Sequence, residues 1–137
     1  TAAALVSENK VLSHPASVDS ISVSADQEDH VSMGPIAVRK CGEILRNVRA
    51  VLAIEMMSAA QAFEFHGGRR PGKATGVAYD LIRTKVPPLK NDRVLYPDIE
   101  EIRKLIESNA LLDAVESEIG PLQLARNVDL PRPNIPA

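Results

Sequence analysis

The chain of 137 residues contains few aromatic residues and almost no cysteine. Tryptophan is absent and aromatic residues make up 3% of the sequence. A core must therefore be built from Ala, Leu, Ile, Val and Met, which favours close-packed helices over a β-sandwich. The single cysteine, Cys41, excludes an internal disulfide and a thiolate cage for a metal ion. It is typical of a reducing compartment, and we expect a cytoplasmic protein.

The sequence also lacks a basic excess, a long apolar run and the spacing of metal ligands. Sixteen basic and eighteen acidic residues give a net charge of −2, which argues against a nucleic-acid partner. No stretch is long and apolar enough for a membrane span. His14, His30 and His66 show no metal-ligand spacing, so we expect no metal site. Because the chain opens on Thr1 and its first residues read like the end of a helix, we expect a segment that begins inside a longer protein.

Hydrophobic spacing and the positions of Gly and Pro predict an all-α fold. The expected elements are a helix end and loop (1–27), a long helix (28–66), shorter helices (73–119) and an extended Pro-rich tail (120–137). The long helix begins either near Glu28, with a bend at Pro35, or near Ser32. The first of the shorter helices is predicted from about Lys73 to Lys85, where two prolines follow.

The long helix is expected to need more partners than this chain supplies. Between Val51 and Phe63 it is apolar almost all round, and such a helix is buried on every side. Short amphipathic helices cannot cover it, and its exposure would leave a large apolar patch. We therefore expect a homo-oligomer or a complex with another chain, with the long helix in a shared bundle.

Two segments contain residues of chemical interest. Gly67–Lys73 fits the glycine and lysine spacing of a phosphate-binding loop, but Ala74 replaces the hydroxyl residue and no strand is predicted before it. We interpret it as an interhelical loop. The segment Gln27–Gly34 brings an amide, carboxylates, an imidazole and a hydroxyl to the predicted helix entry. These residues alone leave two interpretations open, a binding site at the helix start or carboxylates that merely stabilise that start.

Longer stretches resemble histidine ammonia-lyases, of the aromatic amino acid ammonia-lyase family that uses a 4-methylideneimidazol-5-one (MIO) electrophile. The residues that carry the resemblance lie in Ser7–Leu12, His14–Ile21, Gln27–Gly34, Leu52–Ala62 and Val86–Ile99. The resemblance covers about residues 5–115 and concerns the C-terminal portion of the family. It implies a homotetramer with long helices at its centre, and elimination of ammonia from histidine to give urocanate. The Pro-rich tail lies outside it.

The resemblance also assigns roles within Gln27–Gly34. Glu28 occupies the position of the family's acidic residue near the electrophile, where phenylalanine ammonia-lyases have Gln, so it favours histidine as the substrate. The resemblance implies that Glu28 is catalytic and binds the substrate. It also implies that Gln27 binds the substrate beside Glu28, and that His30 orients Glu28. A carboxylate can hydrogen-bond an imidazole N–H or accept the proton of the departing ammonium. Asp29 remains a helix-start carboxylate in this interpretation.

The MIO group forms from an Ala-Ser-Gly tripeptide, and this sequence contains none. We therefore expect the chain to be inactive alone and to act with a chain or portion that carries the electrophile. The alternative is a catalytically inactive helical oligomerisation or regulatory protein derived from the lyase. A neighbouring reading frame that encodes Ala-Ser-Gly would favour the split enzyme over this alternative.

Overall fold

The computed structural model describes residues 1–18, 21–28 and 30–122, and these residues form an all-α chain. The helices are α1 (Ala2–Leu12), a short 3₁₀ helix (Ala16–Val18), α2 (Gly34–Phe63), α3 (Lys73–Lys85), α4 (Tyr96–Glu107) and α5 (Ala110–Ile119). The predicted fold class is confirmed. Within the described residues, none of the helices is both long and apolar enough to cross a bilayer. The residues expected to form the extended tail lie outside the description from 123 onward.

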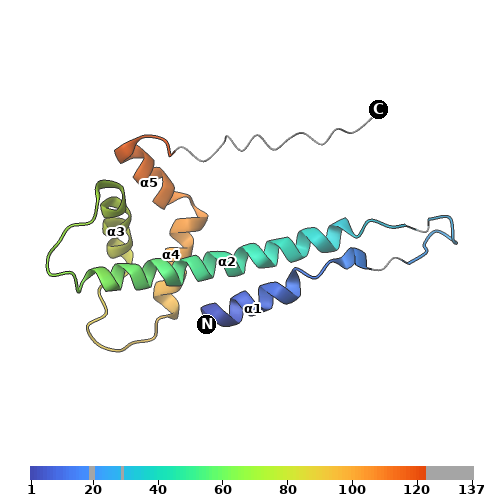
Figure 1. The fold of residues 1–137 in the computed structure, drawn as a ribbon, viewed down its shortest axis with the longest axis horizontal. Helices are drawn as coiled ribbons and strands as arrows, with labels where there is room; N and C mark the ends of the chain where they lie inside the picture. The colour runs from blue at the N-terminus through green and yellow to red at the C-terminus, as the bar shows by residue number, and fades with distance from the viewer. Residues whose placement is uncertain (19–20, 29, 123–137) are drawn as a thin grey trace.

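Helix α2 divides the molecule into two parts along its length (Figure 1). Residues 1–50, which we call the arm, consist of α1, a loop and the first half of α2. Residues 51–122, which we call the helical cluster, contain the second half of α2 with α3, α4 and α5 around it. The loop of the arm extends beyond the N-terminal end of α2, at the opposite end of the molecule from α3 and α5.

The buried core lies entirely in the helical cluster. The buried residues of the described chain are Ala53, Ala60, Ile82, Val86, Ile102, Leu105 and Leu111. Ile102 of α4 and Ala53 of α2 are both 0% exposed, so α4 packs directly on α2. Burial of a side chain such as Ile102 stabilises the fold by about 1.5–3 kcal/mol. The expectation that α2 is apolar almost all round beyond Val51 thus corresponds to a real packing surface, part of which α3 and α4 cover.

The loop between α3 and α4 is held on α2 by polar side chains. The Gln61 side chain bonds both backbone groups of Leu89: Leu89 N donates to Gln61 Oε1 at 2.8 Å, and Gln61 Nε2 donates to Leu89 O at 3.4 Å. The Arg93 guanidinium donates to Asp98 Oδ2 at 2.7 Å and to Pro87 O at 2.8 Å. These contacts supply the loop with the hydrogen bonds that it lacks from secondary structure.

The long helix is shorter than the sequence predicted at both ends. It was expected over 28–66, yet α2 begins at Gly34 and ends at Phe63. Pro35 is in the first turn, where its fixed φ suits a helix start and its missing N–H costs no hydrogen bond, so the helix starts there without a bend. The expected bounds of the next helix are confirmed, because α3 is Lys73–Lys85.

Helix α2 has an apolar stripe that the described residues leave open, and it runs from the arm to the start of the helical cluster. Its members and their exposed fractions are Val38 (73%), Leu45 (49%), Val48 (38%) and Leu52 (38%). Helix α1 packs along the arm and is tied to α2 by Asn47, which donates to Asn9 Oδ1 at 2.9 Å and to Glu8 Oε2 at 3.2 Å. Helix α1 has no buried residue of its own, so this packing is shallow.

Candidate functional site

The predicted site residues Gln27 and Glu28 lie in a tight turn of the arm rather than in a helix. Val23 and Glu28 form an isolated antiparallel bridge and exchange both backbone hydrogen bonds. Val23 N donates to Glu28 O at 3.1 Å, and Glu28 N donates to Val23 O at 3.3 Å. Inside this bridge Gln27 N donates to Ser24 O at 3.2 Å. The backbone of Glu28 is therefore held in a fixed register, although no helix supports it.

Three consecutive residues of this turn adopt left-handed backbone conformations. Their φ angles are 56° for Ser24, 54° for Ala25 and 63° for Asp26. Each costs on the order of 1–2 kcal/mol in a residue that has a Cβ atom, although aspartate tolerates the conformation better than most. Ser22 Oγ donates to Asp26 Oδ1 at 2.7 Å. The turn that precedes Glu28 is therefore strained, and a side-chain hydrogen bond holds it closed.

The side chains assigned to the site are open to solvent. Gln27, Glu28 and His30 are all exposed. Among the described residues, no hydrogen bond or ion pair joins these three side chains to one another. Their turn lies beyond the N-terminal end of α2, and the helix rises about 25 Å from Gly34 to the first residue of the helical cluster, Val51, so the cluster is too distant to complete the site (Figure 1).

The structure excludes the helix-start interpretation for Glu28. Glu28 was considered as a simple helix-start carboxylate, but α2 starts at Gly34 and Glu28 is paired with Val23 in the turn. Glu28 therefore does not cap α2. Asp29, which was also expected at the helix start, lies outside the described residues. The catalytic and binding roles of Glu28, Gln27 and His30 stay predictions.

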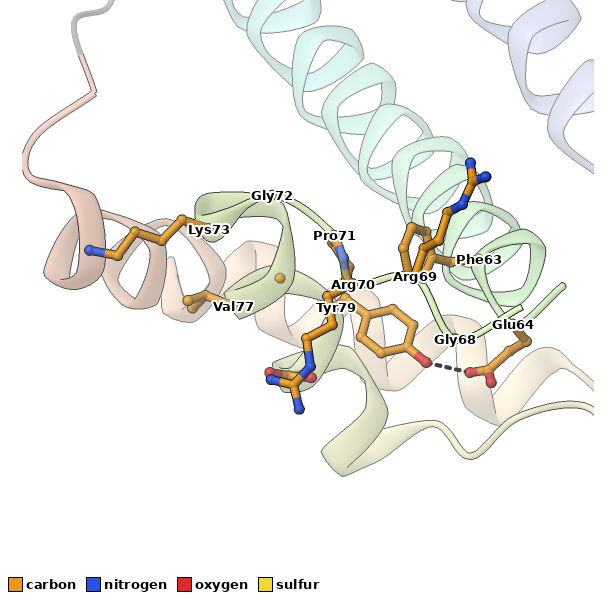
Figure 2. A pocket seen from close by; sticks show the side chains of 12 residues that line it. Phe63, Glu64, Gly68, Arg69, Arg70, Pro71, Gly72, Lys73, Val77 and Tyr79 are labelled. Atoms are coloured by element: carbon orange, nitrogen blue, oxygen red, sulfur yellow. Dashed lines mark hydrogen bonds between the residues drawn. The ribbon is translucent and has the colours of Figure 1, made fainter. Parts of the chain in front are cut away.

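A cavity of about 500 Å³ lies at the other end of α2, beside the start of α3 (Figure 2). Two of its charged lining residues, Glu64 and Lys73, are engaged within the chain. Tyr79 OH donates to Glu64 Oε1 at 2.5 Å, Arg83 Nε lies 2.9 Å from the same oxygen, and Lys73 Nζ lies 3.0 Å from Glu118 Oε1. These groups connect α2 to α3 and α3 to α5. They act as structural contacts, and the other charged residues that line the cavity are Arg69, Arg70 and Asp80.

Gly67–Lys73, which lines part of this cavity, was interpreted as an interhelical loop. It follows α2 and precedes α3, so it lacks the strand that a phosphate-binding loop requires. The described residues contain no group of three or more His, Cys, Asp or Glu side chains that could hold a metal ion. Cys41 is a free, exposed cysteine on α2.

Comparison with known proteins decides the family. The sequence model of the family described as "aromatic amino acid lyase" matches residues 1–84, which include the turn and the whole arm. This chain belongs to the aromatic amino acid lyase family. The match ends near the C-terminal end of α3, so α4 and α5 lie beyond it.

Relatives of this lyase-family chain include histidine ammonia-lyases. That of Symbiobacterium thermophilum is 59% identical over 123 residues, which are 90% of this chain and 24% of that protein. The crystal structure of histidine ammonia-lyase from Trypanosoma cruzi is 44% identical with a TM-score of 0.80, covering 85% of this chain and 23% of that one. A tyrosine aminomutase from Streptomyces globisporus is 36% identical with a TM-score of 0.78, covering 85% and 22%. The chain thus spans about a quarter of the length of the relatives that it matches.

Proposed function

We propose that this chain supplies about a quarter of a histidine ammonia-lyase, which eliminates ammonia from histidine without oxidation and releases urocanate. The observation that carries the proposal is the 59% identity over 123 residues to the Symbiobacterium thermophilum enzyme. Other relatives named histidine ammonia-lyase are 51% to 58% identical. The tyrosine aminomutase is 36% identical, so histidine is the better supported substrate than tyrosine. We also propose that this quarter is the C-terminal portion of the enzyme.

The electrophile of the reaction has to come from outside this sequence. The family resemblance implies an MIO group, which forms from Ala-Ser-Gly. The sequence of 137 residues does not contain that tripeptide. This chain therefore lacks the residues from which the MIO group forms. We place the electrophile on the remaining three quarters of the enzyme, in the same polypeptide or in a partner chain.

Glu28 is the catalytic contribution of this chain in the proposal. Its carboxylate can accept a hydrogen bond from the imidazole of the substrate or take the proton of the departing ammonium. Gln27 binds the substrate beside it, and His30 orients the carboxylate. The bridge to Val23 supports these roles, because a general acid or base must be held in place to be effective. The exposed turn requires a cover from another part of the enzyme, which would also exclude water.

Assembly is the second part of the proposal. The open stripe on α2 (Val38, Leu45, Val48 and Leu52) recurs at intervals of three, four and seven residues, the spacing of a helical bundle. We propose that it contacts other copies of α2 in a homo-oligomer, with four copies at the centre as the family resemblance implies. A cytoplasmic location, without nucleic-acid or membrane partners, fits the net charge of −2 and the free Cys41.

One observation favours the alternative function. The stripe on α2 is an exposed apolar surface of the kind that assembly uses, whereas the described residues do not complete a site around Glu28. A helical oligomerisation or regulatory protein derived from the lyase would keep the apolar stripe and would not need a complete site around Glu28. The two functions therefore differ in whether Glu28 contributes to turnover.

A chimera separates the two functions. The 123 matched residues of this chain replace the corresponding quarter of the Symbiobacterium thermophilum enzyme, and the unmodified enzyme serves as the positive control. We expect the chimera to release urocanate from histidine and Glu28→Gln to lower turnover by about 10²–10⁴-fold with an unchanged melting temperature. The charge and the proton acceptor disappear, but the size of the side chain does not.

The matched control is Glu118→Gln, which removes a surface carboxylate paired with Lys73 and should leave turnover unchanged. A folded chimera without urocanate release would contradict the proposed lyase function. Unchanged turnover in Glu28→Gln would contradict the catalytic role of this residue. Light scattering on the same preparations tests assembly, and a monomeric chimera would contradict the proposed oligomer.

A further inference from the structure

We propose that Ser22 and Asp26 are positioning residues that hold Glu28 in its working orientation. The inference rests on the proposed function, because it presumes that Glu28 takes part in ammonia elimination. It concerns two residues of the same turn, and it rests on the geometry of that turn. Neither residue is assigned to substrate contact.

The first observation is the backbone conformation of Ser24, Ala25 and Asp26. All three have φ between 54° and 63°, a region that side chains with a Cβ atom avoid. None of them is glycine, so the sequence itself does not favour this run. The turn must be stabilised by contacts outside the three residues, since otherwise it would relax to ordinary conformations.

The second observation identifies the side-chain contact. Ser22 Oγ donates to Asp26 Oδ1 at 2.7 Å, and this hydrogen bond connects the residue before Val23 to the last of the left-handed residues. It therefore spans the left-handed run and holds its two ends together. A hydrogen bond to an ionised acceptor is stronger than one between neutral groups.

The third observation connects this contact to Glu28. The paired backbone bonds between Val23 and Glu28 fix the register of the turn. Side chains in an extended pair alternate between faces, so a slip of one residue would turn Glu28 to the opposite face. The Ser22–Asp26 bond keeps the turn at the length that this register requires. Loss of this hydrogen bond would displace the Glu28 carboxylate without changing the Glu28 residue itself.

The test measures kcat and KM of the chimera with Ser22→Ala. We expect kcat to fall by about 10- to 100-fold with KM within about 2-fold, because a displacement of about 1 Å can cost 10²-fold in rate. Asp26→Ala should behave in the same way. Asp26→Asn should retain activity, since asparagine keeps the Oδ1 acceptor and tolerates left-handed backbone. The matched control Ser117→Ala removes another exposed serine bond of 2.7 Å, to Asp113 O, and should change nothing.

A double variant distinguishes positioning from a general structural effect. In a Glu28→Gln background, Ser22→Ala should cause almost no further loss of kcat, because the group that it positions is already disabled. Full additivity of the two losses, or unchanged kcat in Ser22→Ala, would overturn the inference while the lyase function stands. A folded chimera that releases no urocanate would instead overturn the proposed function, so the two failures are distinguishable.

Hydrogen exchange gives a measurement that does not depend on turnover. Loss of the Ser22 hydroxyl should speed exchange at the amides of Val23 and Glu28, which form the bridge. Ser117→Ala should leave these two amides unchanged. Equal exchange in Ser22→Ala and the unsubstituted protein would also overturn the inference, even if the variant lowered kcat.

Discussion

The arm and the helical cluster share one helix but obtain their order in different ways. In the cluster α2 is covered by other helices, and Ala53 and Ile102 are both 0% exposed. In the arm the same helix packs mainly on α1, with Arg49 paired to Glu107 of α4 near the boundary, and Val38 is 73% exposed. The predicted site residues lie in the arm. The part of the chain that has its own core is thus distant from the proposed chemistry, and the part assigned to the chemistry has no buried residue among those described.

The difference teaches that the continuous helix α2 connects a stable region to a dependent one. Backbone hydrogen bonds run along all 30 residues, whereas the buried residues of α2, Ala53 and Ala60, lie only in its second half. Most helix stability in proteins comes from packing of an apolar face. We therefore expect the cluster to resist unfolding in the isolated chain and the arm to gain stability only on assembly.

The largest expected effect is a loss of stability caused by a substitution in the core of the cluster. Ile102→Ala in the 137-residue chain should lower the free energy of unfolding by about 2–5 kcal/mol, because it leaves a cavity at a fully buried position. The matched control is Ile21→Ala, at a residue of the arm that is 63% exposed, and it should change stability by less than about 0.5 kcal/mol. Urea denaturation followed by circular dichroism measures both. Equal losses would contradict the division into two regions.

A smaller effect should have opposite signs in the two regions. Ala60→Gly lies in the buried face of α2 and should destabilise the chain by about 1–2 kcal/mol, from lost helix propensity and a lost buried methyl group. Ala25→Gly should stabilise the turn by about 0.5 kcal/mol, because glycine relieves the left-handed strain and part of this gain is offset by its freedom in the unfolded chain. Hydrogen exchange at Glu28 reports the second change. Faster exchange in Ala25→Gly would contradict the left-handed conformation.

The smallest expected effect is a pH dependence confined to the cluster. The hydrogen bond from Arg103 lowers the pKa of the Glu100 carboxyl below its usual 4.5. A lowered pKa in the folded state means that the ion pair stabilises the protein above pH 4.5 and that this stabilisation is lost as the pH falls through the folded pKa. The pair lies partly exposed on one helix, so its contribution is about 0.2–0.5 kcal/mol.

Between about pH 6 and about pH 3 the free energy of unfolding should therefore fall less in Glu100→Gln than in the unsubstituted chain. The difference should be about 0.2–0.5 kcal/mol. Arg103→Leu removes the partner of both Glu100 and Glu107 and should flatten the curve at least as much. Denaturant midpoints across this pH range measure the difference. A steeper loss of stability in either variant would contradict the direction of the pKa shift.

The sequence predicted the helical cluster better than the arm, for physical reasons. Helix α3 has the expected bounds because Gly72 precedes it and Pro87 follows it closely, and both residues act locally on the backbone. The start of α2 was ambiguous because Glu28 and Ser32 both suit a helix start. Only the structure shows that Pro35 marks the first turn and that Glu28 is outside the helix.

The candidate site shows the opposite limit of sequence reasoning. The residue types of Gln27–Gly34 left a site and helix-start carboxylates both open, and the family resemblance assigned Glu28, yet the strained turn was not predictable. A left-handed run is normally signalled by Gly or Asn, and here it consists of Ser24, Ala25 and Asp26. Its conformation depends on tertiary and side-chain contacts such as that of Ser22 with Asp26, which no local propensity encodes.

Gln61 shows how one side chain can act as a segment of backbone. Its amide presents one donor and one acceptor to Leu89, which is the pattern that a neighbouring strand would offer. Glutamate in its place would keep the shape but have no N–H to donate, and asparagine would be one methylene too short to reach. The position therefore tolerates neither of the two amino acids that resemble glutamine most. This narrow chemical demand lets an irregular loop cross a helix without leaving a peptide group unsatisfied.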